Sequence, residues 1–502
     1  MKLINIKNKA SLMIFLTAFA VGLFSCQTDL LDPAPKTSFD ATVVFDTPSR
    51  VLLQINNLYT TTKSGQFLGG RTQIYGDIRA NDFINRTTNG VTGYLVWQHT
   101  ITETSQNDVA NMWDAAFGAI NQMNVFLQGM EDNEDKFIPP VFPADFATVT
   151  AVQYKAEARF LRALAYHTLL QFYARPFIDG NGNKAGLPLR LSAEKDLKNN
   201  DLARSTVAEV YAQILSDLDY AEQNLPLTYS SASLRVTRAH RNSAIALKTR
   251  VNLTKGDYAG VITEANKIVS AAAPFKASTG VAHELQASIA NVFASPQETI
   301  ESILSFPFTA QNTPGTQNQL GFYYRSSASS SANPGGGEYA LNTTGIIAAS
   351  PNWPDADARR SFVYKVGTES YLGKYPSGTP YIDKAPVIRY SEVMLNLAEA
   401  LARTTSGVDT RALDLLNAVR KRSDATFTWD PAGDNTAFVN AIMLERRIEF
   451  LGEGLRNMDI MRLNSTFPGK GSVAALTPAS PIYAWPIPAT ELSTNALMTR
   501  NE

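Results

Sequence analysis

The sequence predicts a mainly α-helical fold in which stacked helical hairpins carry an irregular, loop-rich face. Residues 154–176 follow a helical pattern that is apolar on two sides, which is typical of a helix buried between partners. Further helical patterns precede and follow this segment. Between 274 and 386, by contrast, helical periodicity fades and aromatic residues stand among Gly, Ser, Asn and Pro. We therefore expect one helical core with loop-rich insertions.

The chain begins with the features of a secretory signal peptide at Met1 to Ser25. Three lysines form a basic start, and Leu12 to Phe24 is apolar but too short to span a bilayer comfortably. The segment Leu23-Phe24-Ser25-Cys26 resembles a bacterial lipobox, in which the cysteine is acylated and becomes the mature N-terminus. An ordinary signal peptide with an incidental cysteine is the alternative. We expect lipidation at Cys26, because several acyl chains would hold the protein on a membrane.

The composition limits which partners the protein can bind and how the chain can be organised. Cys26 is the only cysteine in 502 residues, so an intramolecular disulfide is impossible. The balance of 45 basic and 46 acidic residues argues against a nucleic-acid partner. Residues 26–48 are polar and dotted with proline, which is typical of a tether. We expect 49–502 to form a single domain with loop-rich insertions at about 65–105 and 274–386.

The first half of this domain alternates helix and loop. Ser49 to Thr61 carries one apolar stripe, whereas 65–105 is rich in Gly, Asn, Asp and Thr and is expected to be irregular. Val109 to Met130 is helical again and is the natural antiparallel partner of a helix at Tyr154 to Tyr173. That helix ends before Pro176, which disfavours helix in the residue it follows. Its alternation of aromatic residues and alanines is similar to one arm of a tetratricopeptide-like hairpin, which needs stacked neighbours.

Three further helices precede the long insertion. We expect them at Val207 to Asn224, His240 to Leu253 and Ala259 to Ala273, each from an apolar stripe at helical spacing. The insertion at 274–386 is a long nonrepetitive region, which is uncommon in a compact domain unless it is functional. Within it, Ser326 to Gly337 has low complexity and is expected to be a mobile loop. We interpret the whole insertion as an elaborated face and not as a linker.

The C-terminal part returns to helix at Ile388 to Arg403, Thr410 to Arg422 and Phe438 to Leu463. The last of these presents carboxylates four residues apart, which could serve acid-base chemistry or a metal. Arginines are interleaved with them, however, and ion pairs between packed helices explain that pattern better. The residues interpreted in this way are Glu445, Glu449 and Glu453 with Arg446, Arg447, Arg456 and Arg462, and likewise Glu157, Arg159 and Arg162.

No motif of a known catalytic class is present. The four histidines are scattered, none stands in an HExxH arrangement, and the sequence has no G-x-S-x-G elbow and no P-loop. Asp179, Asn181 and Asn183 imitate the opening of a calcium loop, but Lys184 and Arg190 occupy the positions that need glycine and glutamate. Nothing marks the carboxyl pair that glycoside hydrolysis requires. We therefore expect a binding protein with no catalytic residue, cofactor or metal.

Several motifs together carry a family resemblance over essentially the whole mature chain. They are the lipobox, AEARFLRALAYHTLLQFYARP, RYSEVMLNLAEAL with LLNAVRKRS, ERRIEFLGEGLRNMDIMR and the terminal WPIPATELSTN. In this order they resemble the SusD/RagB family of outer-membrane lipoproteins. The resemblance implies a right-handed helical body of four tetratricopeptide-like hairpins with a loop and short-strand face that binds glycan. It also implies a partner, a TonB-dependent outer-membrane transporter of the SusC type, on which the lipoprotein sits as a lid.

The two insertions supply the residue types that a glycan site needs. Sugar C–H groups lie on aromatic faces, while the hydroxyls require amides, carboxylates or guanidinium groups at the rim. Trp97 is the strongest individual candidate, and loop packing is the alternative role for any single aromatic residue. The candidate ligand-binding residues are Asp77, Arg79, Tyr94 and Trp97 in the first insertion and Tyr323, Tyr324, Arg325 and Trp353 in the second.

The sequence thus predicts non-catalytic capture of an oligosaccharide at the loop face and its delivery to the transporter. Three alternatives remain open at this stage. The cargo could be peptide, the protein could be a surface glycosidase, or it could be a periplasmic helical-repeat adaptor that faces inward. The identity of the glycan is not readable from the chain.

Overall fold

A computed structural model describes residues 43–196, 198–349 and 351–501. The expected signal peptide, Cys26 and most of the expected tether lie outside these residues. The chain divides into two units, Met1–Val51 and Leu52–Glu502. In the first unit, a turn leads into the start of α2 (Pro48–Thr62), and Arg50 donates a hydrogen bond to the carbonyl of Val43 at 3.1 Å. Among the described residues, no helix combines the length and apolarity that a membrane span requires.

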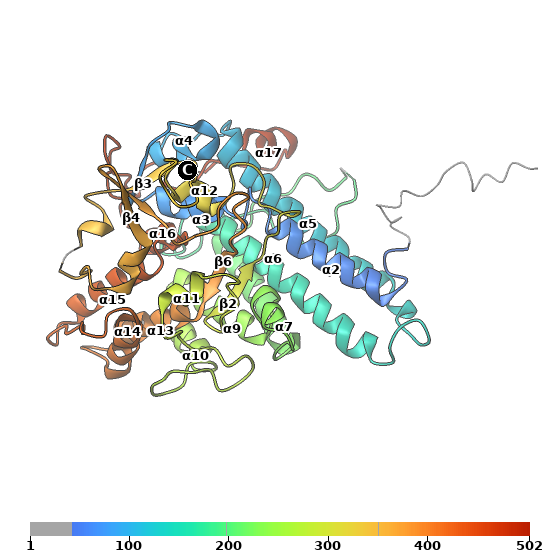
Figure 1. Cartoon of the computed structure of the whole chain (residues 1–502). Coiled ribbons are helices and arrows are strands. Elements are labelled where there is room, and N and C mark those ends of the chain that lie inside the picture. Colours follow the sequence, from blue (N-terminus) through green and yellow to red (C-terminus); the bar gives the residue numbers. More distant parts are fainter. Residues whose placement is uncertain (1–42, 197, 350, 502) are drawn as a thin grey trace, which may run out of the picture. The chain divides into compact units, whose positions relative to one another are not determined.

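The second unit is mainly α-helical, as predicted, and Figure 1 shows its helices lying side by side. Most expected helices are present with ends shifted by a few residues, but the helix expected at Ala259 to Ala273 ends already at Ala265. The helix predicted at Val207 to Asn224 has those bounds in the structure. The long helices are α5 (Asn111–Asp132), α6 (Ala151–Tyr173), α7 (Val207–Asn224), α9 (Arg241–Lys255), α10 (Tyr258–Ala265), α13 (Tyr390–Thr404), α14 (Thr410–Ser423) and α15 (Asn435–Glu449). The short helices include α3 (Arg71–Ile78), α4 (Tyr94–Gln98), α8 (Ala232–Thr237), α11 (Ile289–Phe293), α12 (Leu320–Tyr324), α16 (Leu455–Met461) and α17 (Ala489–Thr494).

Helices α5 and α6 form the predicted antiparallel hairpin. Trp113 meets Tyr173 with ring centroids 5.1 Å apart, and Phe117 meets Tyr166 at 6.2 Å. The contact residue with the higher number on α5 therefore meets the one with the lower number on α6, as antiparallel helices require. The alanines of α6 are buried and allow close approach by neighbouring helices. On its other side α6 packs against α7, so it has partners on both sides, as its two apolar faces predict.

The helix predicted at Phe438 to Leu463 is two helices, α15 and α16, and the prediction of one continuous helix is wrong. Gly452 and Gly454 both adopt positive φ, +85° and +82°, which ends the first helix and starts the second in a new direction. A Cβ on Gly454 would stand 2.5 Å from the Cα of Gln73. The break therefore lets the chain turn and press α16 against α3.

The two insertions join each other through short strands, which the family resemblance implies, and they also contain short helices where the residue pattern predicts irregular structure. A four-stranded antiparallel sheet has the order β1-β3-β5-β4, with Phe83 opposite Leu341 in the register of β1 and β3. Because β1 belongs to the first insertion and the other strands to the second, one sheet unites them. The strands are β1 (Phe83–Asn85), β3 (Tyr339–Leu341), β4 (Val363–Val366) and β5 (Glu369–Leu372), while β2 (Ser302–Phe306) pairs with β6 (Ala385–Arg389) in a separate sheet.

Buried ion pairs tie the second insertion to the C-terminal helices. Glu449 of α15 accepts hydrogen bonds from Arg389 at 2.9 Å, Arg422 at 2.5 Å and Arg359 at 3.1 Å. This confirms that the carboxylates of α15 are ion-pair partners of arginines. The connected group, which we call the carboxylate cluster, consists of Glu301, Asp357, Glu445, Glu449 and Glu453 with Arg359, Lys374, Arg389, Arg420 and Arg422.

Candidate functional site

The candidate site lies where α4 rests beside the sheet that joins the two insertions. Helix α4 is only five residues long and is bounded by two left-handed residues, Gly93 at φ +85° and His99 at φ +58°. The imidazole of His99 is hydrogen-bonded to the carbonyl of Arg79 at 2.9 Å. These ends fix the short helix and set the direction of its side chains. Within it, Tyr94 and Trp97 stand on one side.

Trp97 serves mainly as the base of this site. Only 6% of its surface is exposed, and its indole Nε1 donates to the carbonyl of Phe83 in β1 at 2.9 Å. The ammonium of Lys470 lies 5.8 Å from its ring. A ring held in this way couples α4 to the sheet. It offers little of its own surface to a ligand, so direct contact by Trp97 stays a prediction.

Tyr94 is the part of this pair that reaches the surface. Its ring is half-buried and runs nearly parallel to that of Trp97, with 6.2 Å between centroids and 15° between planes. Its hydroxyl accepts a hydrogen bond from the amide of Gln98 at 2.5 Å. An aromatic face beside an amide is the combination that a sugar ring needs. The sequence argument overlooked Gln98, although a spacing of four residues on a helix places it next to Tyr94.

Asp77 and Tyr324, both predicted to contact ligand, instead meet in the interior. The tyrosine hydroxyl donates to the Asp77 carboxyl at 3.0 Å, and the backbone N–H of Gly454 approaches it at 3.2 Å. Asp77 is 3% exposed and Tyr324 is fully buried. Burial raises the pKa of Asp77 to about 8, against the opposing effect of the Gly454 N–H. These two residues hold α3, α12 and the Gly454 turn together and lie out of reach of a surface ligand.

Arg79 likewise has a structural position. It is 1% exposed, donates to the Asn457 side chain at 2.6 Å and to the carbonyl of Tyr483 at 2.8 Å, and its guanidinium lies 4.4 Å from the ring centre of Phe467. Burial lowers its pKa to about 9. Its hydrogen bonds and its ring contact therefore all join α3 to the C-terminal segment.

The three remaining candidates of the second insertion are buried too. Tyr323 is fully buried, and Trp353 is 1% exposed beneath the guanidinium of Arg360, 4.0 Å away. Arg325 donates to the carbonyls of Ala332 and Asn333 and thereby fixes the serine-rich loop, which the hydroxyl of Tyr381 also holds through Pro334. The structure thus brings Tyr94 and Trp97 together and Asp77 and Tyr324 together, and it leaves Trp353 apart from both pairs. Of the eight predicted residues, Tyr94 is the one with substantial exposed surface.

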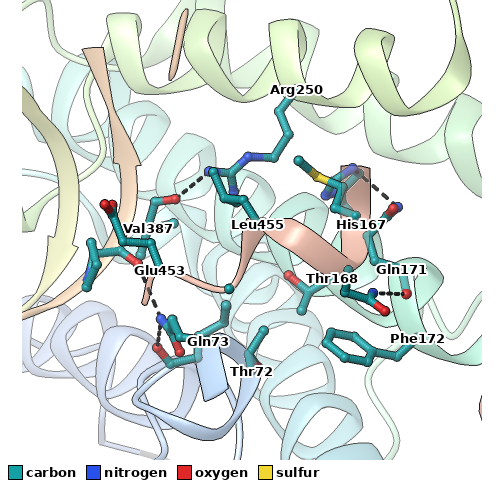
Figure 2. A pocket seen from close by; sticks show the side chains of 15 residues that line it. Thr72, Gln73, His167, Thr168, Gln171, Phe172, Arg250, Val387, Glu453 and Leu455 are labelled. Carbon is teal, nitrogen blue, oxygen red and sulfur yellow. Dashed lines mark hydrogen bonds between the residues drawn. The ribbon is translucent and has the colours of Figure 1, made fainter. Parts of the chain in front are cut away.

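A separate pocket lies between the insertions and the helical body (Figure 2). It has a volume of about 60 Å³ and is lined by residues of α3, α6, α9 and α16, with Gln73, His167 and Arg250 among them. Ligand pockets usually begin at roughly 300 Å³. The side-chain oxygen of Gln73 is buried without a hydrogen-bond partner, which suits an internal water. This pocket is therefore too small for a sugar ring.

The described residues contain no group of three or more His, Cys, Asp or Glu side chains that could hold a metal ion. The residue that opens the imitation calcium loop is already paired, because Asp179 accepts from Arg175 at 2.6 Å. The carboxylates of α15 are likewise paired within the carboxylate cluster.

Comparisons with known proteins agree in sequence and in structure. Residues 29–253 match the family described as "Starch-binding associating with outer membrane", and residues 360–502 match the SusD family. SusD-like protein P38 of Formosa agariphila is 21% identical over 97% of both chains. A SusD superfamily protein from Bacteroides fragilis is 30% identical, covers 91% of this chain and all of its own, and superposes with a TM-score of 0.78. A laminarin-binding SusD-like protein, 20% identical, covers 91% of this chain and 99% of its own with a TM-score of 0.69.

Proposed function

The chain belongs to the SusD family, and from this premise we propose that it is a cell-surface lipoprotein that captures oligosaccharide and delivers it, without catalysis, to a TonB-dependent outer-membrane transporter of the SusC type. Cys26 would carry the lipid, and the protein would be located at the outer membrane. The description of the matching family as starch-binding and associated with the outer membrane supports a carbohydrate ligand and the outer-membrane location. The laminarin-binding relative supports a glycan as the cargo.

The observation that carries the proposal is the half-buried ring of Tyr94 beside the amide of Gln98. Tyr94 stands on the buried ring of Trp97, which is itself bonded to the sheet that unites the two insertions. The aromatic face is therefore rigid before ligand arrives, and little conformational entropy is lost on binding. A sugar ring would lie on Tyr94, and Gln98 would hydrogen-bond to its hydroxyls.

Isothermal titration of a soluble form, starting after Cys26, against plant, host and microbial oligosaccharides tests this proposal. We expect one glycan class to bind and Tyr94→Ala to weaken that binding at least tenfold, about 1.4 kcal/mol. Tyr154→Ala is the matched control, since Tyr154 is half-buried on α6 and should leave affinity unchanged. Trp97→Ala is a poor first variant because truncation of a buried tryptophan side chain to alanine costs about 3–5 kcal/mol of stability. Trp97→Phe keeps most of the volume and should weaken binding less than Tyr94→Ala.

Two outcomes would count against the proposal. If no glycan binds while peptides do, the cargo is peptide. If a glycan binds equally well to the wild type and to Tyr94→Ala, the site lies elsewhere on the molecule. Turnover of a bound glycan that a single carboxylate substitution abolishes would overturn the non-catalytic part.

A further inference from the structure

A second, unassigned hollow lies on the helical side of the molecule, between α5, α6, α7 and the segment at 191–193. Its volume is about 300 Å³, several times that of the pocket in Figure 2 and within the usual range for small-ligand sites. Figure 1 shows α5, α6 and α7 away from the strands β3 and β4 that form part of the loop face. Its lining is mostly polar and comprises Asn124, Leu127, Gln128, Glu131, Arg159, Arg162, Leu191, Ser192, Ala193, Gln213, Ser216 and Asp217.

The floor of the hollow is rigid because its polar groups satisfy one another. Arg162 donates to both carboxylate oxygens of Asp217 at 2.8 Å and to the side-chain oxygen of Asn124 at 2.8 Å. The amide of Asn124 in turn donates to the carbonyls of Arg190 and Ser192, which fixes the loop that forms the rim. The charges of Arg162 and Asp217 cancel, so the floor does not attract a charged ligand.

Arg159 differs from its neighbours on α6. Glu157 pairs with Arg238 at 2.6 Å and Arg162 pairs with Asp217, but Arg159 makes no hydrogen bond or ion pair with any residue that the structure describes. Its guanidinium lies flat over Tyr220 of α7, 4.1 Å from the ring centre, and its Nε is buried without a partner. The ion-pair interpretation of Arg159 from sequence is therefore wrong. A guanidinium that is already ordered and unpaired is suited to bind a carboxylate through two parallel hydrogen bonds.

The walls add groups that match a hydroxylated ligand. Gln213, Ser216 and Ser192 contribute amide and hydroxyl groups from two sides of the hollow. Glu131 is exposed on the rim, where solvent weakens the effect of its negative charge on the hollow without removing it. We propose that this hollow binds a uronic acid unit of an acidic oligosaccharide, with Arg159 holding the carboxylate and the wall amides and hydroxyls holding the ring hydroxyls.

A singly charged carboxylate fits these observations better than a phosphate group. One unpaired guanidinium compensates one negative charge, whereas a doubly charged phosphate would also face Glu131 across the hollow. The hydroxyls of a neutral sugar could also accept hydrogen bonds from Arg159, but they would leave its charge uncompensated and would lack the two-oxygen acceptor that matches the guanidinium. Removing the Glu131 charge should for the same reason strengthen binding of a uronate.

Titration with trigalacturonate and with its fully methyl-esterified form tests the proposal. We expect the full chain lacking its first 26 residues to bind the acid at least tenfold more tightly than the ester. Arg159→Gln should remove that preference, Arg159→Lys should retain part of it, and Glu131→Gln should increase it. Lys155→Gln is the matched control, because it removes one positive charge from the same helix at a residue that does not line the hollow. Thermal unfolding of each variant verifies that the fold is intact.

The outcomes separate this site from the loop face. Retention of the acid preference in Arg159→Gln would overturn the proposal, as would equal losses in Arg159→Gln and Lys155→Gln. An acid preference that Tyr94→Ala abolishes but Arg159→Gln leaves intact would assign the uronate to the loop face and refute the second site. If trigalacturonate and a panel of glucuronate- and mannuronate-containing oligosaccharides all fail to bind, the proposal is wrong whatever the loop face binds.

Discussion

Replacement of Glu449 by glutamine tests whether the carboxylate cluster holds the second insertion on the helical body. Glu449 is fully buried on α15 and accepts hydrogen bonds from Arg359, Arg389 and Arg422. Burial by itself would raise the pKa of Glu449, but the three guanidinium groups hold that pKa well below its usual range. Glutamine keeps the shape of the side chain, removes the charge and turns an N–H₂ group towards donors that need an acceptor.

The expected loss of stability follows from the buried arginine charges that remain after the substitution. Removal of one member of a buried ion pair costs about 3–5 kcal/mol, because the remaining charge stays buried without compensation. A body of this size, Leu52–Glu502, has an unfolding entropy of roughly 1 kcal/mol per kelvin. Glu449→Gln should therefore lower the Tm by about 3–5 °C in calorimetry at pH 7. Because the cluster includes Arg359 of the insertion, the loop 274–386 should also become more sensitive to limited proteolysis.

Glu298→Gln is the matched control for this experiment. Glu298 belongs to the same insertion and pairs with Lys384 at 3.0 Å, but 26% of its side chain is exposed. Such pairs contribute about 1 kcal/mol or less, so its Tm should change by less than about 1 °C. Equal shifts for the two variants would refute the assignment of a larger stabilising role to the buried cluster.

Two further predictions concern the pH dependence of stability. The folded-state pKa of Asp77 is about 8 and its ordinary value is 3.8, so the contribution of Asp77 to the unfolding free energy should fall as pH rises between these values. Asp77→Asn lacks this dependence, so its unfolding free energy relative to that of the wild type should rise by up to about 1.4 kcal/mol per pH unit. Urea unfolding from pH 5 to 8 would measure this difference in unfolding free energy. A difference that does not change with pH would contradict the raised pKa. Burial lowers the pKa of His283 to about 4, so the native state stays neutral while the unfolded chain binds a proton below about pH 6.5. The contribution of His283 to stability should fall as pH drops from 6.5 to 4, so the stability of the wild type relative to His283→Gln should fall by up to about 1.4 kcal/mol per pH unit; a difference that does not change with pH would show that His283 titrates normally.

Most helices could be predicted because their signals are local. The helix at Val207–Asn224 has an N-terminal capping box of Thr206 and Glu209, and its stripe continues without interruption to its end. The break between α15 and α16 was missed because ERRIEFLGEGLR keeps apolar spacing through Gly452 and Gly454. Only the close approach of α3 to Gly454, a contact between distant parts of the sequence, determines that the chain turns there.

The resemblance implies short strands in this face, but their positions and their pairing could not be predicted, for a related reason. Strands such as β1 and β3 are three residues long, too short for an alternating pattern to stand out. Their pairing joins residues about 83 and 341, and no local feature predicts which distant strand will be the partner. The sequence did indicate that both insertions form one face, because both combine aromatic residues with turn-forming residues.

The residues of a binding face proved harder to predict than the face itself, and side-chain chemistry explains the difference. Tyrosine, tryptophan and arginine bury a large apolar area and also satisfy buried backbone groups, so they are as useful for fastening long loops as for contacting sugars. Tyr324, Trp353 and Arg325 are used in the first way: the Tyr324 hydroxyl bonds to Asp77 of α3, and the other two residues contact neighbouring parts of the second insertion. Composition cannot separate the two uses, because both need the same residue types in the same loops. What separates them is a side chain that is not fully engaged by its neighbours. The half-buried ring of Tyr94 and the unpaired guanidinium of Arg159 are the two places among the described residues where these arguments assign a ligand.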